Sequence, residues 1–118
     1  MTGKLTTHVL DTARGRPGHG IAIDVYRITD SGAVLVCTAR TNADGCCDEP
    51  LLAGDRFTTG VYQLVFHAAA YFRSAGVDLP DTPFLGDVVI RFGIDDPDQH
   101  YHVPLLLSPY GYSTYRGS

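Results

Sequence analysis

The sequence predicts a mostly β protein, a two-sheet antiparallel β-sandwich of about eight strands with one short helix. Apolar residues recur at every second position over short segments, which is the period of a strand that buries one face. Thirteen glycines and seven prolines among 118 residues separate these segments at short intervals. Very little of the chain carries the longer period of an amphipathic helix. Short alternating segments between turn signals are typical of β-sandwiches, and the same pattern also fits a closed barrel.

Alternation of apolar and polar residues marks seven candidate strands. In the first of them, Leu5 and Val9 share the side expected in the core, so that His8 faces away from it. The other candidates repeat this arrangement, with one side richer in apolar residues than the other. The expected strands are Lys4–Asp11, Ile21–Thr29, Ala33–Thr41, Val61–Ala69, Val88–Ile94, Tyr101–Leu107 and about Tyr110–Arg116.

Two local signals interrupt the strands. Asn42–Gly45 has the composition of a turn, because Asn, Asp and Gly tolerate the backbone angles that turns require. The segment Ala69–Ala75 has room for two helical turns, and the following Gly76 suits a helix C-cap. We therefore expect one tight turn before the middle of the chain and one short helix after it.

Length and charge limit the classes of function. A chain of 118 residues fits a single domain, 1–118. Its 13 acidic and 9 basic residues give a net charge of −4, which argues against nucleic-acid binding through a basic face. No apolar run approaches the ~20 residues of a membrane helix, and the start lacks the apolar core of a signal peptide. We therefore expect a cytoplasmic protein that binds neither nucleic acid nor membrane.

The three cysteines do not form a recognisable framework. Cys37 stands alone and Cys46 adjoins Cys47, a spacing that indicates neither a disulfide scaffold nor a zinc knuckle. Reduced thiols are the simplest interpretation. A nucleophilic role for Cys46 would require a base beside it, and the sequence identifies none.

Three histidines are candidates for chemistry. His100 and His102 alternate with apolar residues of their strand and therefore face away from the core, about 6–7 Å apart. His8 faces outward from the first strand in the same way. Exposed histidines are ordinary when they stand singly. Three imidazoles also suit zinc, but no carboxylate or cysteine lies at a diagnostic spacing from the pair, so no metal site is expected.

The chain ends in an unusual segment that contains Tyr115, Arg116, Gly117 and Ser118. Chain ends are more often bland or charged. One interpretation is an edge strand that pairs with another subunit, since tyrosine favours strands and interfaces. The other is that this tetrapeptide lines a site, in which Arg116 supplies a planar, permanently charged donor to an anionic or carbonyl-rich ligand.

Three segments are the most discriminating: HVLD beginning at His8, HYHVPLL beginning at His100, and the terminal YRGS. The longer segments that contain these motifs, and others between them, follow one family's sequence pattern in order along the chain. They are Thr6–Thr12, Arg40–Gly45, Gly60–Phe66, Tyr71–Phe72, Phe84–Leu85, His100–Pro109 and Tyr112–Ser118. Together they resemble the transthyretin-like family over nearly the whole chain, and more narrowly its 5-hydroxyisourate hydrolase branch. Hormone-carrying transthyretins resemble this fold but lack the terminal tetrapeptide and the histidine set.

The resemblance implies a transthyretin-like sandwich assembled as a homotetramer, a dimer of dimers with its sites in a central channel. It implies hydrolysis of 5-hydroxyisourate, the unstable product of urate oxidation, to 2-oxo-4-hydroxy-4-carboxy-5-ureidoimidazoline, with no metal or organic cofactor. By motif, His8 and His102 match the catalytic histidines, and either of them is a candidate for the general base. His100 lies beside the second on the same face. Tyr115–Ser118 match the segment that contacts the substrate.

One residue departs from the family pattern. The family usually has an arginine that contacts substrate directly after the Asn-x-Asp-Gly turn, and here Cys46 occupies that place. Arg40 precedes the turn and is not an obvious replacement by position. Two alternatives to hydroxyisourate hydrolysis therefore stay open. One is a diverged homologue that acts on or binds another small cyclic ligand. The other is a structural or carrier protein whose exposed strands drive tetramer formation.

Overall fold

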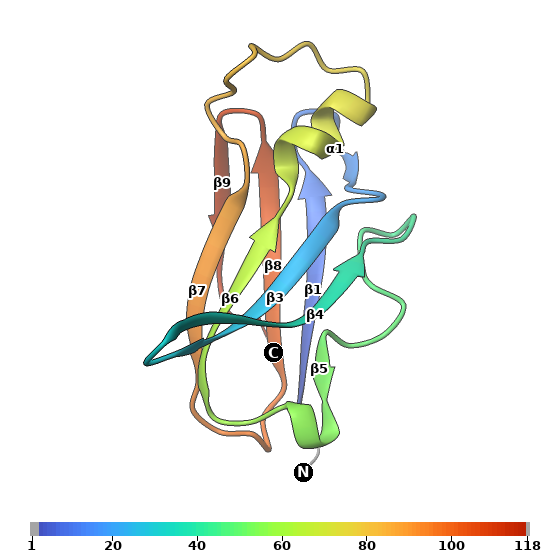
Figure 1. The fold of residues 1–118 in the computed structure, drawn as a ribbon. Helices are drawn as coiled ribbons and strands as arrows, with labels where there is room; N and C mark the ends of the chain where they lie inside the picture. Colours follow the sequence, from blue (N-terminus) through green and yellow to red (C-terminus); the bar gives the residue numbers. More distant parts are fainter. Residues whose placement is uncertain (1–2, 118) are drawn as a thin grey trace.

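Two β-sheets face each other in the structure, a computed structural model that describes residues 3–117 (Figure 1). All seven strands that the alternation predicts are present, within a few residues of the expected bounds. Two further strands, β2 and β5, have only two residues each and were not expected from the sequence. The elements are β1 Lys4–Asp11, β2 Arg16–Pro17, β3 Ala22–Thr29, β4 Gly32–Arg40, β5 Leu52–Ala53, a 3-10 turn at Gly54–Arg56, β6 Gly60–Phe66, α1 Ala68–Ser74, β7 Val88–Ile94, β8 Tyr101–Ser108 and β9 Gly111–Thr114.

The two sheets differ in strand direction. One has the order β4-β3-β6-β7, and all of its pairs are antiparallel. The other has the order β2-β1-β8-β9, with β5 also paired to β1. Its central pair, β1 and β8, runs parallel, with Thr6 opposite His102. The predicted antiparallel sandwich therefore needs correction at this pair. Because β1 and β8 come from opposite ends of the chain, no hairpin forces their directions to alternate.

Alternate side chains of both sheets fill the space between them. In β1, Leu5 and Val9 are fully buried, whereas His8 is half-buried on the outer face. The predicted core faces are confirmed in β1, β3, β6, β7 and β8, whereas β4 and β9 contain no fully buried residue. Full burial of one such apolar side chain contributes about 1.5–3 kcal/mol, so a register slip in any strand would be costly. The largest fully buried side chains are Tyr62, Phe57, Phe66, Phe72, Leu5, Ile21, Ile23, Leu52, Leu64, Ile94, Leu105 and Leu107.

The helix α1 covers one end of the sandwich (Figure 1). It buries Tyr71 and Phe72 against the core. The chain leaves β6 after Phe66 and begins the helix at Ala68, so the predicted strand overran its end by three residues. Gly76 has a positive φ of 84°, which confirms the predicted C-cap. Among residues 3–117 no helix is long and apolar enough to cross a membrane.

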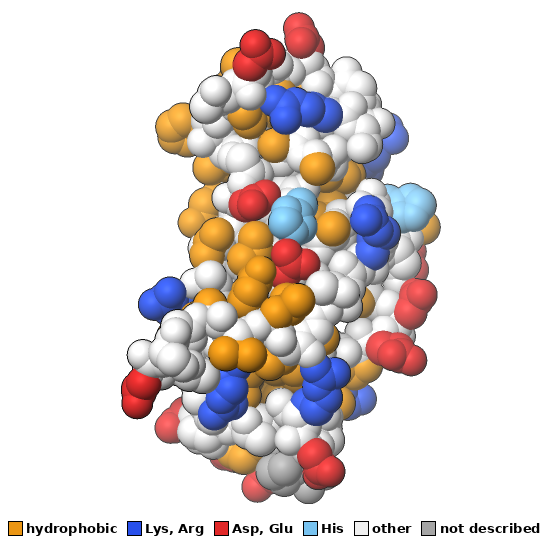
Figure 2. All heavy atoms as spheres, viewed as in Figure 1, with side chains coloured by type: hydrophobic (Ala, Val, Ile, Leu, Met, Phe, Trp, Pro, Cys, Tyr) orange, Lys and Arg blue, Asp and Glu red, His pale blue; other side chains and the backbone are white. Residues whose placement is uncertain are grey.

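The outer face of the β4-β3-β6-β7 sheet, the side seen in Figure 2, mixes apolar, charged and histidine side chains. His67, directly before α1, bridges two carboxylates there. Its Nε2 lies 2.9 Å from Asp24 Oδ2, and its Nδ1 lies 3.1 Å from Asp87 Oδ1. The hydrogen bond to Asp24 is the main cause that raises the pKa of His67 above its ordinary value. The imidazole of His67 therefore joins the start of the helix to β3 and to the segment before β7.

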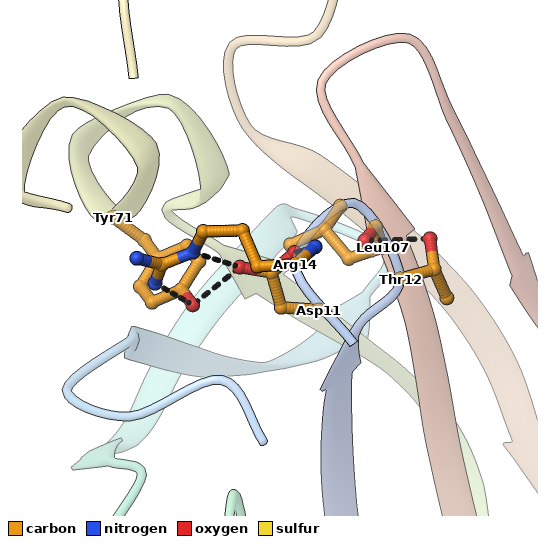
Figure 3. Close-up of polar contacts among 5 residues, drawn as sticks. All are labelled: Asp11, Thr12, Arg14, Tyr71 and Leu107. Carbon is orange, nitrogen blue, oxygen red and sulfur yellow. Dashed lines mark hydrogen bonds and ion pairs between the residues drawn. The ribbon is translucent and has the colours of Figure 1, made fainter. Parts of the chain in front are cut away.

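A buried carboxylate joins the end of β1 to the helix (Figure 3). Asp11 is fully buried. Its Oδ2 accepts hydrogen bonds from the Tyr71 hydroxyl at 2.7 Å and from Arg14 Nε at 3.0 Å, and its Oδ1 accepts one from the Arg14 backbone. Burial alone would raise the pKa of Asp11, but the bonds from Tyr71 and Arg14 outweigh burial, and the pKa is lowered.

Candidate functional site

Four separate segments meet on the outer face of the β2-β1-β8-β9 sheet. They are β1, β8, the turn at residues 42–46 and the C-terminal tail. The parallel register of β1 and β8 brings Thr6 opposite His102, so side chains from both ends of the chain share this face. We call it the histidine face and define it by Thr6, His8, Cys46, His100 and His102.

The predicted turn at Asn42–Gly45 is confirmed, and it delivers Cys46 to the histidine face. Asn42 Oδ1 accepts hydrogen bonds from the backbone N–H groups of Asp44 and Cys46, at 2.9 and 3.2 Å. Gly45 has a φ of 80°, and a Cβ there would lie 2.5 Å from the carbonyl oxygen of Val9. Only glycine fits this turn so closely against β1.

His8 is held between β1 and this turn. Its Nε2 lies 3.0 Å from the carbonyl oxygen of Asp44. Because a carbonyl can only accept, the neutral ring carries its proton on Nε2 and keeps a lone pair on Nδ1. An antiparallel bridge pairs His8 with Cys46, so the imidazole and the thiol project to the same side of the sheet.

The hydroxyl of Thr6, on β1, contacts the ring of His102. Thr6 Oγ1 lies 2.9 Å from Nδ1 of His102 and 3.1 Å from Nε2 of His100. Burial is the main cause that lowers the pKa of His102, and the neighbouring His100 and His8 lower it further. A lowered pKa keeps this imidazole neutral at physiological pH, which is the form that accepts a proton from water.

The C-terminal tail reaches the histidine face at Gly117. Its backbone N–H donates to the carbonyl oxygen of His102 at 2.6 Å. A Cβ at this position would lie 3.0 Å from Cδ2 of the His102 ring, so the tail packs directly on the imidazole. Gly117 is therefore the residue of the terminal segment Tyr115–Ser118 that meets His102. Ser118 lies outside the described residues.

The side chain of Arg116 lies on the other face of the same sheet. Its guanidinium lies over the ring of Tyr101 at 4.0 Å, and it donates to Gln99 Oε1 and to the carbonyl of His100 at 2.9 and 3.1 Å. Arg116 and Tyr115 line a cleft of about 250 Å³ between β7 and β9. Within one chain, therefore, the predicted ligand contact of Arg116 does not reach the histidine face.

Comparison with known proteins agrees with this fold. A family model described as the HIUase/Transthyretin family matches residues 5–117. This chain belongs to the HIUase/Transthyretin family. The predicted resemblance and the transthyretin-like sandwich are thereby confirmed.

Members of the HIUase/Transthyretin family similar to this chain cover nearly its full length. The 5-hydroxyisourate hydrolase 2 of Rhizobium meliloti (strain 1021) is 65% identical over 117 residues, 99% of this chain and 98% of that protein. The 5-hydroxyisourate hydrolase of Pseudomonas aeruginosa is 60% identical over 116 residues, 98% of this chain and 92% of that protein. Among solved structures, (S)-allantoin synthase has a TM-score of 0.92 at 47% identity over 98% of this chain, which spans 44% of that longer chain.

Within one chain, Arg40 does not reach the place where the family pattern has an arginine and this sequence has Cys46. Its Nη1 donates to the carbonyl of Gly20 at 2.7 Å, and its side chain lines a cleft of about 470 Å³ together with Cys47. Within one chain it points away from the histidine face. All three cysteines are free, as the sequence predicts. Cys47 packs against the core, and burial raises its pKa. Cys46 is paired with His8 by a β-bridge and is therefore the thiol of the histidine face.

Two parts of the site were not singled out from the sequence. Thr6 stands in the sequence analysis only as the start of the segment Thr6–Thr12, although its hydroxyl contacts two imidazoles. The Asp44 carbonyl, which orients His8, is a backbone group and leaves no compositional signal. In the described part of the chain, no group of three or more His, Cys, Asp or Glu side chains is placed to hold a metal ion.

Proposed function

We propose that this chain hydrolyses 5-hydroxyisourate to 2-oxo-4-hydroxy-4-carboxy-5-ureidoimidazoline in urate degradation. The observation that carries the proposal is the meeting of His8, His102 and the tail at Gly117 on one open sheet face. Two relatives with 60% and 65% identity, each covering nearly the whole chain and named for this activity, support it.

The reaction requires water to attack an amide-like carbonyl carbon of a six-membered ring. His102 is the general base: its neutral ring accepts a proton from water as the water oxygen bonds to that carbon. The ring C–N bond then breaks, and His102 returns the proton to the departing nitrogen. A positioned base of this kind contributes roughly 10²–10⁴-fold to the rate.

His8 orients the substrate in this scheme. Its Nε2–H donates a hydrogen bond to the Asp44 carbonyl. Its Nδ1 therefore presents a lone pair, which accepts a hydrogen bond from a ring N–H of the substrate. Stabilisation of the developing oxyanion by backbone donors of the tail stays a prediction, because the Gly117 N–H is donated to the His102 carbonyl within one chain. Substrate contact by Arg116 requires its guanidinium to leave the ring of Tyr101, and it stays a prediction, as do the contacts of Tyr115, Ser118, Arg40 and His100.

The proposed active form is a homotetramer in which the histidine faces of different subunits line a channel. Within one chain β7 and β9 are edge strands, which leave backbone groups free for pairing with a second copy. Large apolar side chains on the strands are also exposed, and many orange side chains lie on the face seen in Figure 2. The exposed examples on strands are Val34, Leu35, Val61, Val89 and Tyr112. Light scattering should give about 51 kDa, four times the chain mass of 12.8 kDa.

Cys46 favours a second candidate, a diverged homologue that acts on or binds another small cyclic ligand. Loss of one charge-assisted contact costs about 1.5–3 kcal/mol, or roughly ten- to a hundred-fold in affinity or rate. Cys46→Arg measures this cost directly, because the bridge to His8 places residue 46 on the histidine face. A gain of that size in hydroxyisourate hydrolysis would show that the native chain is weakened or diverged for this substrate.

The proposal is tested by generating 5-hydroxyisourate from urate with urate oxidase and following its decay by absorbance. The expected result is that the wild-type chain accelerates the decay well above the spontaneous rate in proportion to its concentration. Wild type and Cys46→Arg are measured together. No acceleration by either protein would remove the proposal and favour the carrier interpretation. Acceleration by Cys46→Arg alone would favour the diverged homologue.

A further inference from the structure

The hydroxyl of Thr6 lies between two imidazoles of the histidine face. Its Oγ1 is 2.9 Å from Nδ1 of His102 and 3.1 Å from Nε2 of His100, both within hydrogen-bond distance. A hydroxyl carries a single proton. When both imidazoles are neutral, Thr6 can donate to at most one of them, so it accepts an N–H from at least one. A ring that donates to Thr6 carries its proton on the nitrogen that faces this hydroxyl.

We propose that Thr6 is a positioning residue, which accepts a hydrogen bond from Nδ1–H of His102 and donates its own proton to Nε2 of His100. This arrangement leaves the lone pair of His102 on Nε2, where a general base needs it. The inference rests on the proposed hydrolysis for its catalytic meaning. The hydrogen-bond pattern itself is a property of the protein without substrate.

The surroundings of His102 favour this direction. Gly117 packs on the Cδ2 edge of the ring and Thr6 holds the Nδ1 edge, so the ring cannot turn freely. Within residues 3–117, Nε2 of His102 makes no hydrogen bond that would compete for its lone pair. The titratable groups that face this ring are His100, directly before β8, and His8 on β1. The opposite pattern would put the proton on Nε2 and make His102 a donor instead of a base.

The same contacts provide a path for the proton taken from water. As Nε2 of His102 accepts that proton, its Nδ1 proton passes to Oγ1 of Thr6, and the Thr6 hydroxyl proton passes to Nε2 of His100. Oγ1 of Thr6 gains one proton and loses one, His102 exchanges its Nδ1 proton for one on Nε2 and ends neutral, and His100 becomes the imidazolium. The positive charge leaves the partly buried His102, where burial disfavours it. The transfer runs back when the ring nitrogen of the substrate departs.

The test combines a tautomer measurement with kinetics. Long-range ¹H–¹⁵N correlation spectra of the wild-type chain with ¹⁵N-labelled histidine, at about pH 8 without substrate, report which ring nitrogen of His102 and His100 carries the proton. The variants are Thr6→Val, which removes the hydroxyl and keeps the shape, and Thr6→Ser, which restores the hydroxyl. Thr12→Val is the matched control, because Thr12 Oγ1 also bonds β8, at the Leu107 carbonyl, but lies away from the imidazoles (Figure 3).

In the wild type we expect a protonated Nδ1 and a free Nε2 on His102. Thr6→Val should lose this preference and lower kcat on the order of ten-fold with little change in KM, whereas Thr6→Ser and Thr12→Val stay near wild type. An unprotonated Nδ1 on His102 in the wild type would overturn the inference, even if Thr6→Val failed to fold. An unchanged tautomer in Thr6→Val would do the same. Failure of the wild type to hydrolyse 5-hydroxyisourate would remove only the proposed function, because the spectra need no substrate.

Discussion

Replacement of Gly117 by alanine tests whether the tail positions His102. The Gly117 N–H donates to the His102 carbonyl at 2.6 Å, so the two backbones are already in close contact. A Cβ on residue 117 would lie 3.0 Å from Cδ2 of His102, 3.3 Å from its Cβ and 3.4 Å from its carbonyl oxygen. Carbon atoms pack best at about 3.5–4.0 Å. The imidazole or the tail must therefore move by a few tenths of an ångström.

A movement of this size changes the packing of the fold little, but it approaches the positional precision that catalysis requires. Catalytic groups must be held within about 0.5 Å of their productive position, and a misplacement of 1 Å can cost ~10²-fold. We therefore expect Gly117→Ala to lower kcat for 5-hydroxyisourate on the order of ten-fold. The melting temperature should change little, because Gly117 is half-buried at the end of the chain and outside the core.

The assay is the coupled urate decay, with thermal unfolding measured on the same samples. Gly86→Ala is the matched control, because a Cβ at Gly86 meets nothing within 4 Å. This variant should keep wild-type kcat. Wild-type kcat in Gly117→Ala would show that the tail does not position His102, and an equal loss in both variants would show that the effect is not local.

Three further predictions concern stability and pH. Tyr71→Phe removes a hydrogen bond to the buried Asp11 carboxylate and should lower the free energy of unfolding by about 1.5–3 kcal/mol by denaturant titration, whereas the exposed Tyr110→Phe should have no effect. Folding raises the pKa of His67. The contribution of His67 to the free energy of unfolding should therefore be complete below the ordinary histidine pKa near ~6.5, and it should be lost as the pH rises through the raised pKa. The melting-temperature difference between wild type and His67→Gln should therefore shrink from pH 5 to pH 9, and a constant difference would contradict this. Because the pKa of His102 is lowered, the acidic limb of kcat/KM should have its midpoint below ~6.5, and a midpoint above this value would exclude His102 as the base.

The outward direction of the histidines could be predicted from sequence because it depends on local alternation. Leu5 and Val9 must be buried, so His8 has to face outward, and the same reasoning applies to His102. The turn at Asn42–Gly45 could be predicted for a similar reason, since its residue types act through their own backbone angles. These features need no knowledge of which strands are neighbours.

The arrangement of the site depends on non-local pairing, which local periodicity does not contain. The parallel register of β1 and β8 decides that Thr6 lies opposite His102, and the bridge of His8 to Cys46 decides which thiol joins the site. Neither pairing could be read from alternation. Alternation also could not show that the side chain of Arg116 lies against Tyr101 on the other face of the sheet.

The most direct test of the central claim is the hydrolysis rate of chains that lack one imidazole of the histidine face. His8→Gln and His102→Gln are compared with His19→Gln, whose side chain is exposed in a separate cleft of about 370 Å³. In the coupled urate assay, each of the first two variants should lose roughly 10²–10⁴-fold in kcat/KM and approach the spontaneous rate, and His19→Gln should match wild type. Full activity in both His8→Gln and His102→Gln would contradict the account.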